Sequence, residues 1–335
     1  MNVVFANSRR AVYDAQGRRL GCAAEHNFLP GGLRLSRLKQ LSDSSLNIPM
    51  PDAKRKQKPA VSIIGAGRLG TALAVALASR EYPLRSLVAR HARSARRAAG
   101  FLGQDVQILA SKQLRTLRPA DVFLITTPDD QIAGVAEELS VVFSKGIALH
   151  TSGALSAEIL SPLREKGWQT GSIHPLISVS ARTDGALPGA FWSVEGDNTA
   201  LRVAKSIVRD LGGKSFSIRS EDKPLYHAAA VMASGNVVAL FDVALEMLTS
   251  CGLTRKTAQS ILLPLIASTV HNLQTKDPKQ ALTGTFARGD VETVKRHLAA
   301  LKDNEDALEL YRLLGKRSLK LTKKHPQITQ ILKSV

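Results

Sequence analysis

Apolar and polar positions alternate along this chain in two different ways. Between residues 60 and 218, short apolar runs rich in β-branched residues are separated by stretches with helical periodicity, which predicts strands followed by helices. The predicted strands are 60–64, 84–89, 105–109, 121–126 and 146–150, then Phe191–Glu195 and Lys214–Ile218 on either side of a helix near 197–211. This alternation is typical of an α/β fold with a doubly wound parallel sheet.

After Ile218 the pattern predicts helices alone. They cover 223–251, 255–273, a stretch that begins at Asp290, and 304–322. Two of them are apolar on nearly every face, so we expect burial inside a helical bundle or against a second copy, as in a homodimer. The expected organisation is an α/β domain over 58–220 and an all-α domain over 221–335.

Residues 1–57 show no sustained periodicity and carry Gly31-Gly32, Pro49 and Pro51, which indicates a disordered leader. The leader holds ten Lys/Arg and four Asp/Glu but lacks the apolar core of a secretory signal. Two alternatives stay open. One is a mitochondrial-type presequence, and the other, which we favour, is translation that begins at Met50.

The composition is that of a soluble globular protein, with 44% hydrophobic and 22% charged residues. No run of 18 or more apolar residues is present, so we expect no membrane span. Cys22 and Cys251 lie far apart and form neither a disulfide framework nor metal-ligand spacing, which fits a reducing cytoplasm and no metal site.

The net charge of +18 raises the question of a nucleic-acid partner. The basic residues are scattered, however, and aromatic residues make up only 4% of the chain, which leaves few side chains for base stacking. We therefore expect no nucleic-acid partner. A basic surface also attracts an anionic cofactor and a small anionic carboxylate substrate.

A glycine-rich segment follows the strand predicted at 60–64. It reads Gly65-Ala66-Gly67-Arg68-Leu69-Gly70, and a helical pattern begins at once. Gly65 allows a tight turn, Gly67 lets the backbone approach a pyrophosphate, and Gly70 lets the helix pack closely on the sheet. The phosphates then meet the helix N-terminus. Strand, turn and helix together predict a dinucleotide site over residues 65–70.

The second predicted strand indicates which dinucleotide binds. An NAD site places Asp or Glu against the ribose 2′-hydroxyl about 20 residues past the glycines. Here the strand ends at Arg90, Arg93 and Ser94 follow, and no carboxylate is available. Because guanidinium groups match phosphate geometry, Arg90 and Arg93 favour a 2′-phosphate and hence NADP(H). The alternative is a solvated, basic helix start.

Polar segments follow the carboxyl ends of later strands, where ligands bind in doubly wound sheets. They are Thr126-Thr127-Pro128, His150-Thr151-Ser152 and Gly171–Leu176, the last of which contains His174. We expect Thr126, Thr127 and Pro128 to complete the cofactor site. Asp129 is expected to be the N-cap of the next helix rather than a catalyst.

Further candidates lie in the helical half. His227 and Ser234 are seven residues apart and share one face of a regular helix, whereas Asn236 lies on the other. The alternative for His227 is a satisfied histidine at a helix start. Arg288 is the best available anchor for a substrate carboxylate, and Asp290 the expected N-cap of the helix that follows. The alternative for Arg288 is a surface arginine.

These motifs resemble the family that pairs a Rossmann-like domain with domain of unknown function 2520. That family belongs to the 6-phosphogluconate-dehydrogenase-like reductases, near pyrroline-5-carboxylate reductase and ketopantoate reductase. The resemblance covers about 58–325 and is carried by Gly65–Gly70, His150–Ser156, Gly171–Leu176, Tyr226–Val231 and Leu282–Leu298. Thr285 and Gly235 depart from the family pattern, in which we expect proline and asparagine.

The resemblance implies an NADPH-dependent reductase of a small ketone or imine that bears a carboxylate, with ketopantoate as the leading candidate. His174 or His227 would supply the proton, Ser152 would hydrogen-bond the developing alkoxide, and Arg288 would hold the carboxylate. Lys223 stands at the very start of the helical run 223–251, before the helix proper, so no lysine is expected at the helix position that many related dehydrogenases use. That absence favours the alternative, a non-catalytic NADP(H) sensor or interaction protein.

Overall fold

A computed structural model describes residues 11–13, 19–22, 57–179, 187–322 and 325–333. The chain divides into two compact units, Met1–Gln57 and Lys58–Val335. In the first unit the described residues form a two-stranded antiparallel sheet of β1 (Ala11–Tyr13) and β2 (Arg19–Cys22). Met50 lies outside the described residues, and the expectations for the leader stay predictions.

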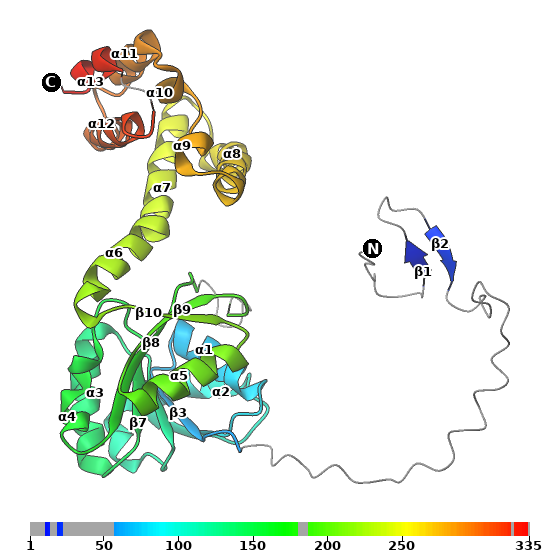
Figure 1. The fold of residues 1–335 in the computed structure, drawn as a ribbon, viewed down its shortest axis with the longest axis vertical. Helices are drawn as coiled ribbons and strands as arrows, with labels where there is room; N and C mark the ends of the chain where they lie inside the picture. The colour runs from blue at the N-terminus through cyan, green and yellow to red at the C-terminus, as the bar shows by residue number, and fades with distance from the viewer. Residues whose placement is uncertain (1–10, 14–18, 23–56, 180–186, 323–324, 334–335) are drawn as a thin grey trace. The chain divides into compact units, whose positions relative to one another are not determined.

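The second unit begins with an eight-stranded sheet in the order β10-β9-β8-β7-β6-β3-β4-β5 (Figure 1). The strands are β3 (Val61–Ile64), β4 (Leu84–Ala89), β5 (Gln107–Ala110), β6 (Val122–Ile125), β7 (Ile147–His150), β8 (Gln169–Pro175), β9 (Phe191–Gly196) and β10 (Lys214–Ser217). Neighbouring strands are parallel except β8 and β9. The predicted α/β class is confirmed, with the correction that the sheet is mixed rather than wholly parallel.

Strand β8 is the strand of this eight-stranded sheet that the sequence pattern did not predict, because its glycine, serine, histidine and proline do not resemble a strand. Gly171 is required there, since a Cβ on it would lie 2.8 Å from the carbonyl oxygen of Glu195 on β9. His174 therefore lies on a strand, opposite Ser193, and not in a loop.

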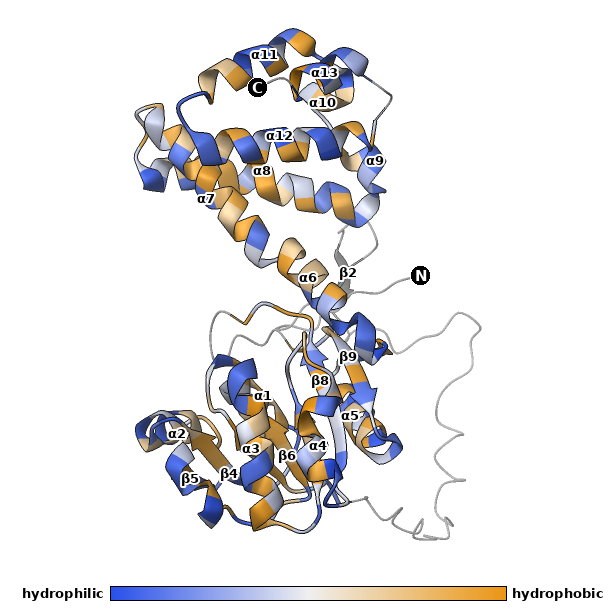
Figure 2. Ribbon diagram, turned by 90° about the vertical axis from the view of Figure 1, so that its left-hand side faces the viewer, coloured by the Kyte–Doolittle hydropathy of each residue, from blue (hydrophilic) through white to orange (hydrophobic). Residues whose placement is uncertain are grey.

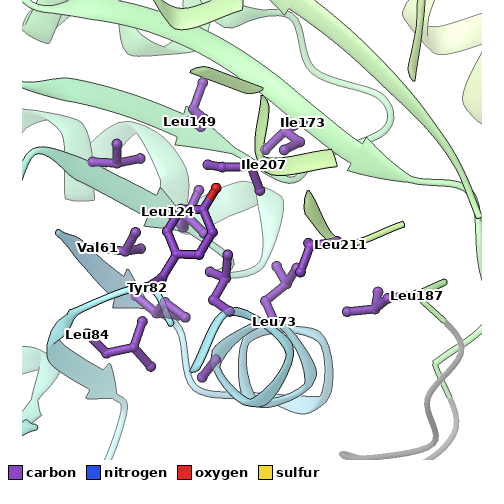
Figure 3. Packing of buried hydrophobic residues seen from close by; sticks show 14 of the residues in the cluster. Val61, Leu73, Tyr82, Leu84, Leu124, Leu149, Ile173, Leu187, Ile207 and Leu211 are labelled. Atoms are coloured by element: carbon purple, nitrogen blue, oxygen red, sulfur yellow. The ribbon is translucent and has the colours of Figure 1, made fainter. Parts of the chain in front are cut away.

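Helices cover both faces of the sheet (Figure 1). One face carries α1 (Arg68–Ala78), α2 (Ala92–Ala99) and α5 (Asn198–Asp210), and the other carries α3 (Asp129–Val142), α4 (Ser161–Arg164) and the 3-10 turns η2 (Ser111–Thr116) and η3 (Ala157–Leu160). In the first layer Tyr82, Leu73 and Ile207 pack against the strands (Figure 3). The Tyr82 hydroxyl satisfies its hydrogen bond by donating to Asp210, 2.8 Å away. Each face of the sheet thus has its own apolar layer.

After β10 the described chain is helical. The elements are the 3-10 turn η4 (Ser220–Asp222), α6 (Lys223–Ala233), α7 (Gly235–Ser250), α8 (Arg255–Thr275), α9 (Pro278–Ala281), α10 (Thr285–Arg288), α11 (Val291–Ala300), α12 (Glu305–Leu319) and α13 (Pro326–Ile331). The single helix predicted over 223–251 is broken at Ser234, whose φ of −128° and ψ of −77° leave the helical region. Ser234 and Gly235 are both weak helix formers, which explains the break.

The apolar helices are not buried within this chain. Val238 on α7 is 69% exposed, and Leu263 and Leu265 on α8 are 48% and 62% exposed. Apolar residues are plain along both helices in Figure 2. The expectation that these helices are buried inside a bundle is therefore wrong. The other expectation, that a second copy of the chain covers them, stays a prediction.

The same region bears on the expectation that no segment spans a membrane, which stays a prediction. Ser220–Ser250 is long and apolar enough to cross a membrane by length and composition alone, with a mean hydropathy of 1.8 and only 6% of its apolar window buried.

Candidate active site

The turn between β3 and α1 has the geometry that its glycines predict. Gly65 has a φ of +116°, which favours glycine, and a Cβ on Gly70 would collide with the Gly65 carbonyl oxygen. Among the described residues a Cβ on Gly67 would meet only that oxygen, at 3.9 Å, which leaves open space in front of α1. Gly67 is the N-cap of α1 and provides no side-chain hydrogen bond to it. The turn thus leaves room and free N–H groups for a phosphate.

A cavity of about 300 Å³ adjoins this turn. Gly65, Arg90, Ser111 and Thr127 line it together with Gln131, Glu138 and apolar side chains. The Thr127 hydroxyl is buried and has no hydrogen-bond partner among the described atoms, so it is left for a ligand. Arg93 lies nearby in sequence, on the exposed first turn of α2. These residues fit the adenosine part of a dinucleotide that carries a 2′-phosphate.

The loops after β6 and β7 are joined to the turn and to each other. Thr126 donates a hydrogen bond to the Gly65 carbonyl oxygen over 2.7 Å. Pro128 is the N-cap residue of α3, and Asp129 is the first residue of the helix itself. The Asp129 carboxylate accepts the Ser152 hydroxyl over 2.8 Å. The expected cap at Asp129 was therefore wrong, and this carboxylate instead orders the loop after β7.

Ser152 differs from its expected role for the same reason. Its hydroxyl donates to Asp129 and accepts the N–H groups of Ala154 and Leu155, at 3.2 and 3.0 Å. A hydroxyl has one proton to donate. Ser152 therefore does not offer a donor to an alkoxide in this arrangement, and its part is to hold the loop.

Lys223 is the first residue of α6 and is fully buried. Its Nζ donates to the Ser172 hydroxyl at 2.5 Å and to the Ser152 carbonyl oxygen at 3.2 Å, and lies 3.6 Å from a carboxylate oxygen of Glu195. Burial lowers the pKa of Lys223, and Glu195 opposes that shift. The expectation that Lys223 lies outside the helix was wrong, and the sensor alternative loses its main support.

His174 on β8 and His227 on α6 face each other, with ring centroids 5.7 Å apart. A Cβ on Gly153 would lie 2.5 Å from Nδ1 of His227 and 2.8 Å from Nε2 of His174, so only glycine leaves room for both rings. Burial, followed by the charges of His227 and Lys223, lowers the pKa of His174 to about 4. Nδ1 of His227 is buried and has no partner among the described atoms.

His150 has a structural role. Its Nδ1 accepts the N–H of Ser152 at 3.2 Å, and its Nε2 lies 3.1 Å from the Ser156 carbonyl oxygen. Because Nδ1 accepts, the ring proton lies on Nε2 and is donated to Ser156. Burial lowers the pKa of His150 to about 3, so the ring is neutral and fixes the loop.

A cavity of about 410 Å³ opens beside the two histidines. His174, Tyr226, His227 and Ser234 line it, together with Ser178 and with apolar side chains from Pro175, the residues that follow β8, and α6. His227 and Ser234 thus share one cavity in spite of the helix break. Asn236 is not among its lining residues, and the Asn236 amide lies 3.1 Å from the sulfur of Met232. No lysine or arginine is found in the described lining.

Arg288 is not brought to this cavity. It ends α10, which packs on α11 and α12. Asp290 caps α11 as predicted, since its carboxylate accepts the N–H of Thr293 at 3.1 Å. The role of Arg288 as a carboxylate anchor stays a prediction.

Sequence reasoning missed Lys223, Tyr226 and Glu195. A signal for the first two was present, because Lys223, Tyr226 and His227 have the i, i+3, i+4 spacing of one helix face at the start of an apolar helix. Glu195 ends a predicted strand and pairs with residues that only the fold brings near it, namely Lys223 and the hydroxyl of Ser220 at 2.5 Å.

Comparison with known proteins agrees with this architecture. Residues 47–175 match the model of a Rossmann-like domain, and residues 190–318 match the domain of unknown function DUF2520. A search of curated proteins gave no match.

Similar solved structures include a “putative NADP oxidoreductase” from Bacteroides fragilis, with 22% identity, a TM-score of 0.67 and coverage of 79% of this chain and 99% of that one. A Thermotoga maritima protein has 26% identity, a TM-score of 0.63 and coverage of 78% and 98%. A reductive aminase from Aspergillus terreus, solved with NADPH and ethyl levulinate, has 14% identity, a TM-score of 0.56 and coverage of 82% and 99%. The chain belongs to the proteins in which a Rossmann-like domain is followed by a DUF2520 domain, and it shares the fold of NADP-dependent reductases.

Proposed function

We propose that the protein is an NADPH-dependent reductase of the C=O or C=N group of a small carboxylate-bearing molecule, with ketopantoate as the leading candidate. The observation that carries this proposal is a set of hydrogen bonds that joins the glycine-rich turn to the loop after β7, where Gly153 lies against both histidine rings. Thr126 bonds Gly65, Asp129 follows Thr126 by three residues and bonds Ser152, and Lys223 bonds the carbonyl of Ser152. The cofactor turn and the histidine cavity are thus parts of one site.

The cofactor would be held by residues already described. The turn over residues 65–70 and the free hydroxyl of Thr127 would bind the pyrophosphate and ribose, and Arg90 and Arg93 would bind the 2′-phosphate. When bound, NADPH supplies the hydride that reduces the substrate.

Proton delivery is assigned to His227 in this proposal. The low pKa of His174, about 4, leaves that ring neutral at neutral pH and makes it a poor acid. His227 has an unpartnered Nδ1 beside Gly153 and lines the same cavity. Lys223 holds the backbone of Ser152 in place by donating a hydrogen bond to its carbonyl oxygen.

A second copy of the chain is part of the proposal. A carboxylate in the cavity needs a cation, because an unpaired buried charge costs several kcal/mol. The described lining contains none, and the exposed apolar faces of α7 and α8 are suited to a homodimer contact. We assign the cation to Arg288 of the second copy.

Mixing two variants tests the shared site. Arg288→Ala alone should lose at least about tenfold in kcat/KM and His227→Gln alone about 100-fold in kcat, and a mixture that exchanges subunits should regain part of the activity. No recovery in a mixture shown to exchange subunits would place both residues in sites formed by one chain, or remove Arg288 from the site.

Turnover tests the function itself. NADPH oxidation is measured with ketopantoate, other 2-keto acids and cyclic imines, for the wild type and for His227→Gln. We expect turnover with at least one of these compounds, and a fall of about 100-fold in kcat for the variant with NADPH affinity retained. NADPH binding without turnover on any of them would support the sensor alternative.

A further inference from the structure

The ring of His174 is held by a neighbour that the proposed mechanism has not used. The hydroxyl of Tyr226 on α6 lies 2.8 Å from Nδ1 of His174, and the two rings meet edge to face with centroids 5.6 Å apart. Both residues line the 410 Å³ cavity. The contact joins β8 to α6 at the site.

The direction of this hydrogen bond follows from the chemistry of the two groups. Burial raises the pKa of Tyr226, so its hydroxyl keeps its proton at neutral pH. His174 is neutral, and a neutral imidazole has one N–H donor and one unprotonated nitrogen. A phenol is the stronger acid of the two, so it donates and Nδ1 accepts. The single ring proton of His174 then lies on Nε2.

The Nε2 atom of His174 lies close to His227, beside Gly153. Nε2 of His174 and Nδ1 of His227 both lie within 2.8 Å of the place that a Cβ of Gly153 would occupy, so the two nitrogens border the same small space. A donor fixed on Nε2 is therefore next to the residue to which proton delivery is assigned.

We propose that Tyr226 is a positioning residue that locks His174 as the Nε2–H tautomer, so that the cavity presents a fixed, uncharged N–H donor to the oxygen or nitrogen of the reacting group. This inference rests on the proposed function for its catalytic meaning. The tautomer itself is a property of the protein without substrate, so the two can fail separately.

The chain provides a matched control for the test. In the helical region the hydroxyl of Tyr311 lies 2.7 Å from Nδ1 of His297, again edge to face, with centroids 5.5 Å apart. Tyr311→Phe removes the same kind of contact outside the cavity. Tyr226→Phe removes only the hydroxyl and keeps the ring.

The experiment is long-range proton–nitrogen NMR on the full chain labelled with ¹⁵N-histidine, with the His174 signals assigned from His174→Gln. We expect His174 of the wild type to carry its proton on Nε2, Tyr226→Phe to give a mixture of tautomers, and Tyr311→Phe to leave the His174 signals unchanged. A proton on Nδ1 in the wild type, or an unchanged tautomer in Tyr226→Phe, would overturn the inference.

Steady-state kinetics of Tyr226→Phe test whether the His174 tautomer affects the reaction. Where the wild type turns over, Tyr226→Phe should lower kcat about tenfold and leave the KM for NADPH within twofold, because the lost interaction acts on the reacting group. A shift of the tautomer with kcat unchanged would refute the positioning role while leaving the reductase proposal intact. Absence of turnover in the wild type would refute the reductase proposal while the NMR result still stands.

Discussion

Replacing Lys223 by methionine tests the buried charge pair between Lys223 and Glu195. Methionine keeps much of the side-chain length and removes the charge, which leaves Glu195 without its cation. Breaking a buried pair from one side costs roughly 3–5 kcal/mol. Glu195 retains the N–H of Ala157 at 2.7 Å and the hydroxyl of Ser220 at 2.5 Å, so we expect the lower end, about 3 kcal/mol of unfolding free energy.

Urea unfolding followed by tryptophan fluorescence measures this loss, since Trp168 and Trp192 are both almost completely buried. Adding Glu195→Gln to Lys223→Met should recover about 1–2 kcal/mol, because the orphaned charge is removed. The control is Lys295→Met, whose exposed pair with Glu292 should contribute less than about 1 kcal/mol. A loss below about 1 kcal/mol for Lys223→Met, or no recovery in the double variant, would refute the pairing.

Four further predictions concern the cofactor, the substrate and pH. Gly70→Ala should weaken NADPH binding at least about tenfold in a fluorescence titration, because its Cβ collides with the turn, and unchanged binding would contradict this. Arg90→Asp should weaken NADPH by roughly 1–3 kcal/mol and NADH far less; equal losses would place the 2′-phosphate elsewhere. Arg288→Ala should lower kcat/KM at least about tenfold with NADPH affinity unchanged, and steady-state kinetics that show neither change would make it a surface residue. The pKa values of His150 and His174 are lowered from 6.5 to about 3 and about 4, so the unfolded chain binds more protons than the folded chain between pH 6.5 and 4. The free energy of unfolding should therefore decrease as the pH is lowered from 6.5 to 4. A urea midpoint that does not change over this range would contradict the prediction.

The sequence predicted the sheet well where periodicity is strong. The runs around Val61–Ile64 and Val122–Ile125 are apolar and β-branched, and burial on both faces produces that pattern. The glycine-rich turn was equally predictable, because each glycine answers a local steric need. Strand β8 was not predicted because Gly171 is required by its close approach to Glu195, 24 residues further along the chain.

The candidate site was predictable only in part, for a related reason. Residues at the ends of predicted strands, such as Thr126 and His150, can be placed by the rule for doubly wound sheets. Hydrogen-bond partners and ion pairs cannot be predicted in this way, because Asp129 contacts Ser152, and Lys223 contacts Glu195, only once the fold has formed. The local sequence predicted that Asp129 caps a helix, whereas in the structure its carboxylate makes a tertiary hydrogen bond with Ser152.

The central claim is that the glycine-rich turn and the histidine cavity form one reductase site. The most direct measurement is a single turnover with stoichiometric NADPH deuterated at the transferred position, with the label followed by NMR into ketopantoate, other 2-keto acids and cyclic imines. We predict that the label appears on the carbonyl or imine carbon of at least one of them, and much more slowly in His227→Gln at equal NADPH occupancy. Saturation of the protein with labelled NADPH and no transfer to any of these compounds would contradict the claim.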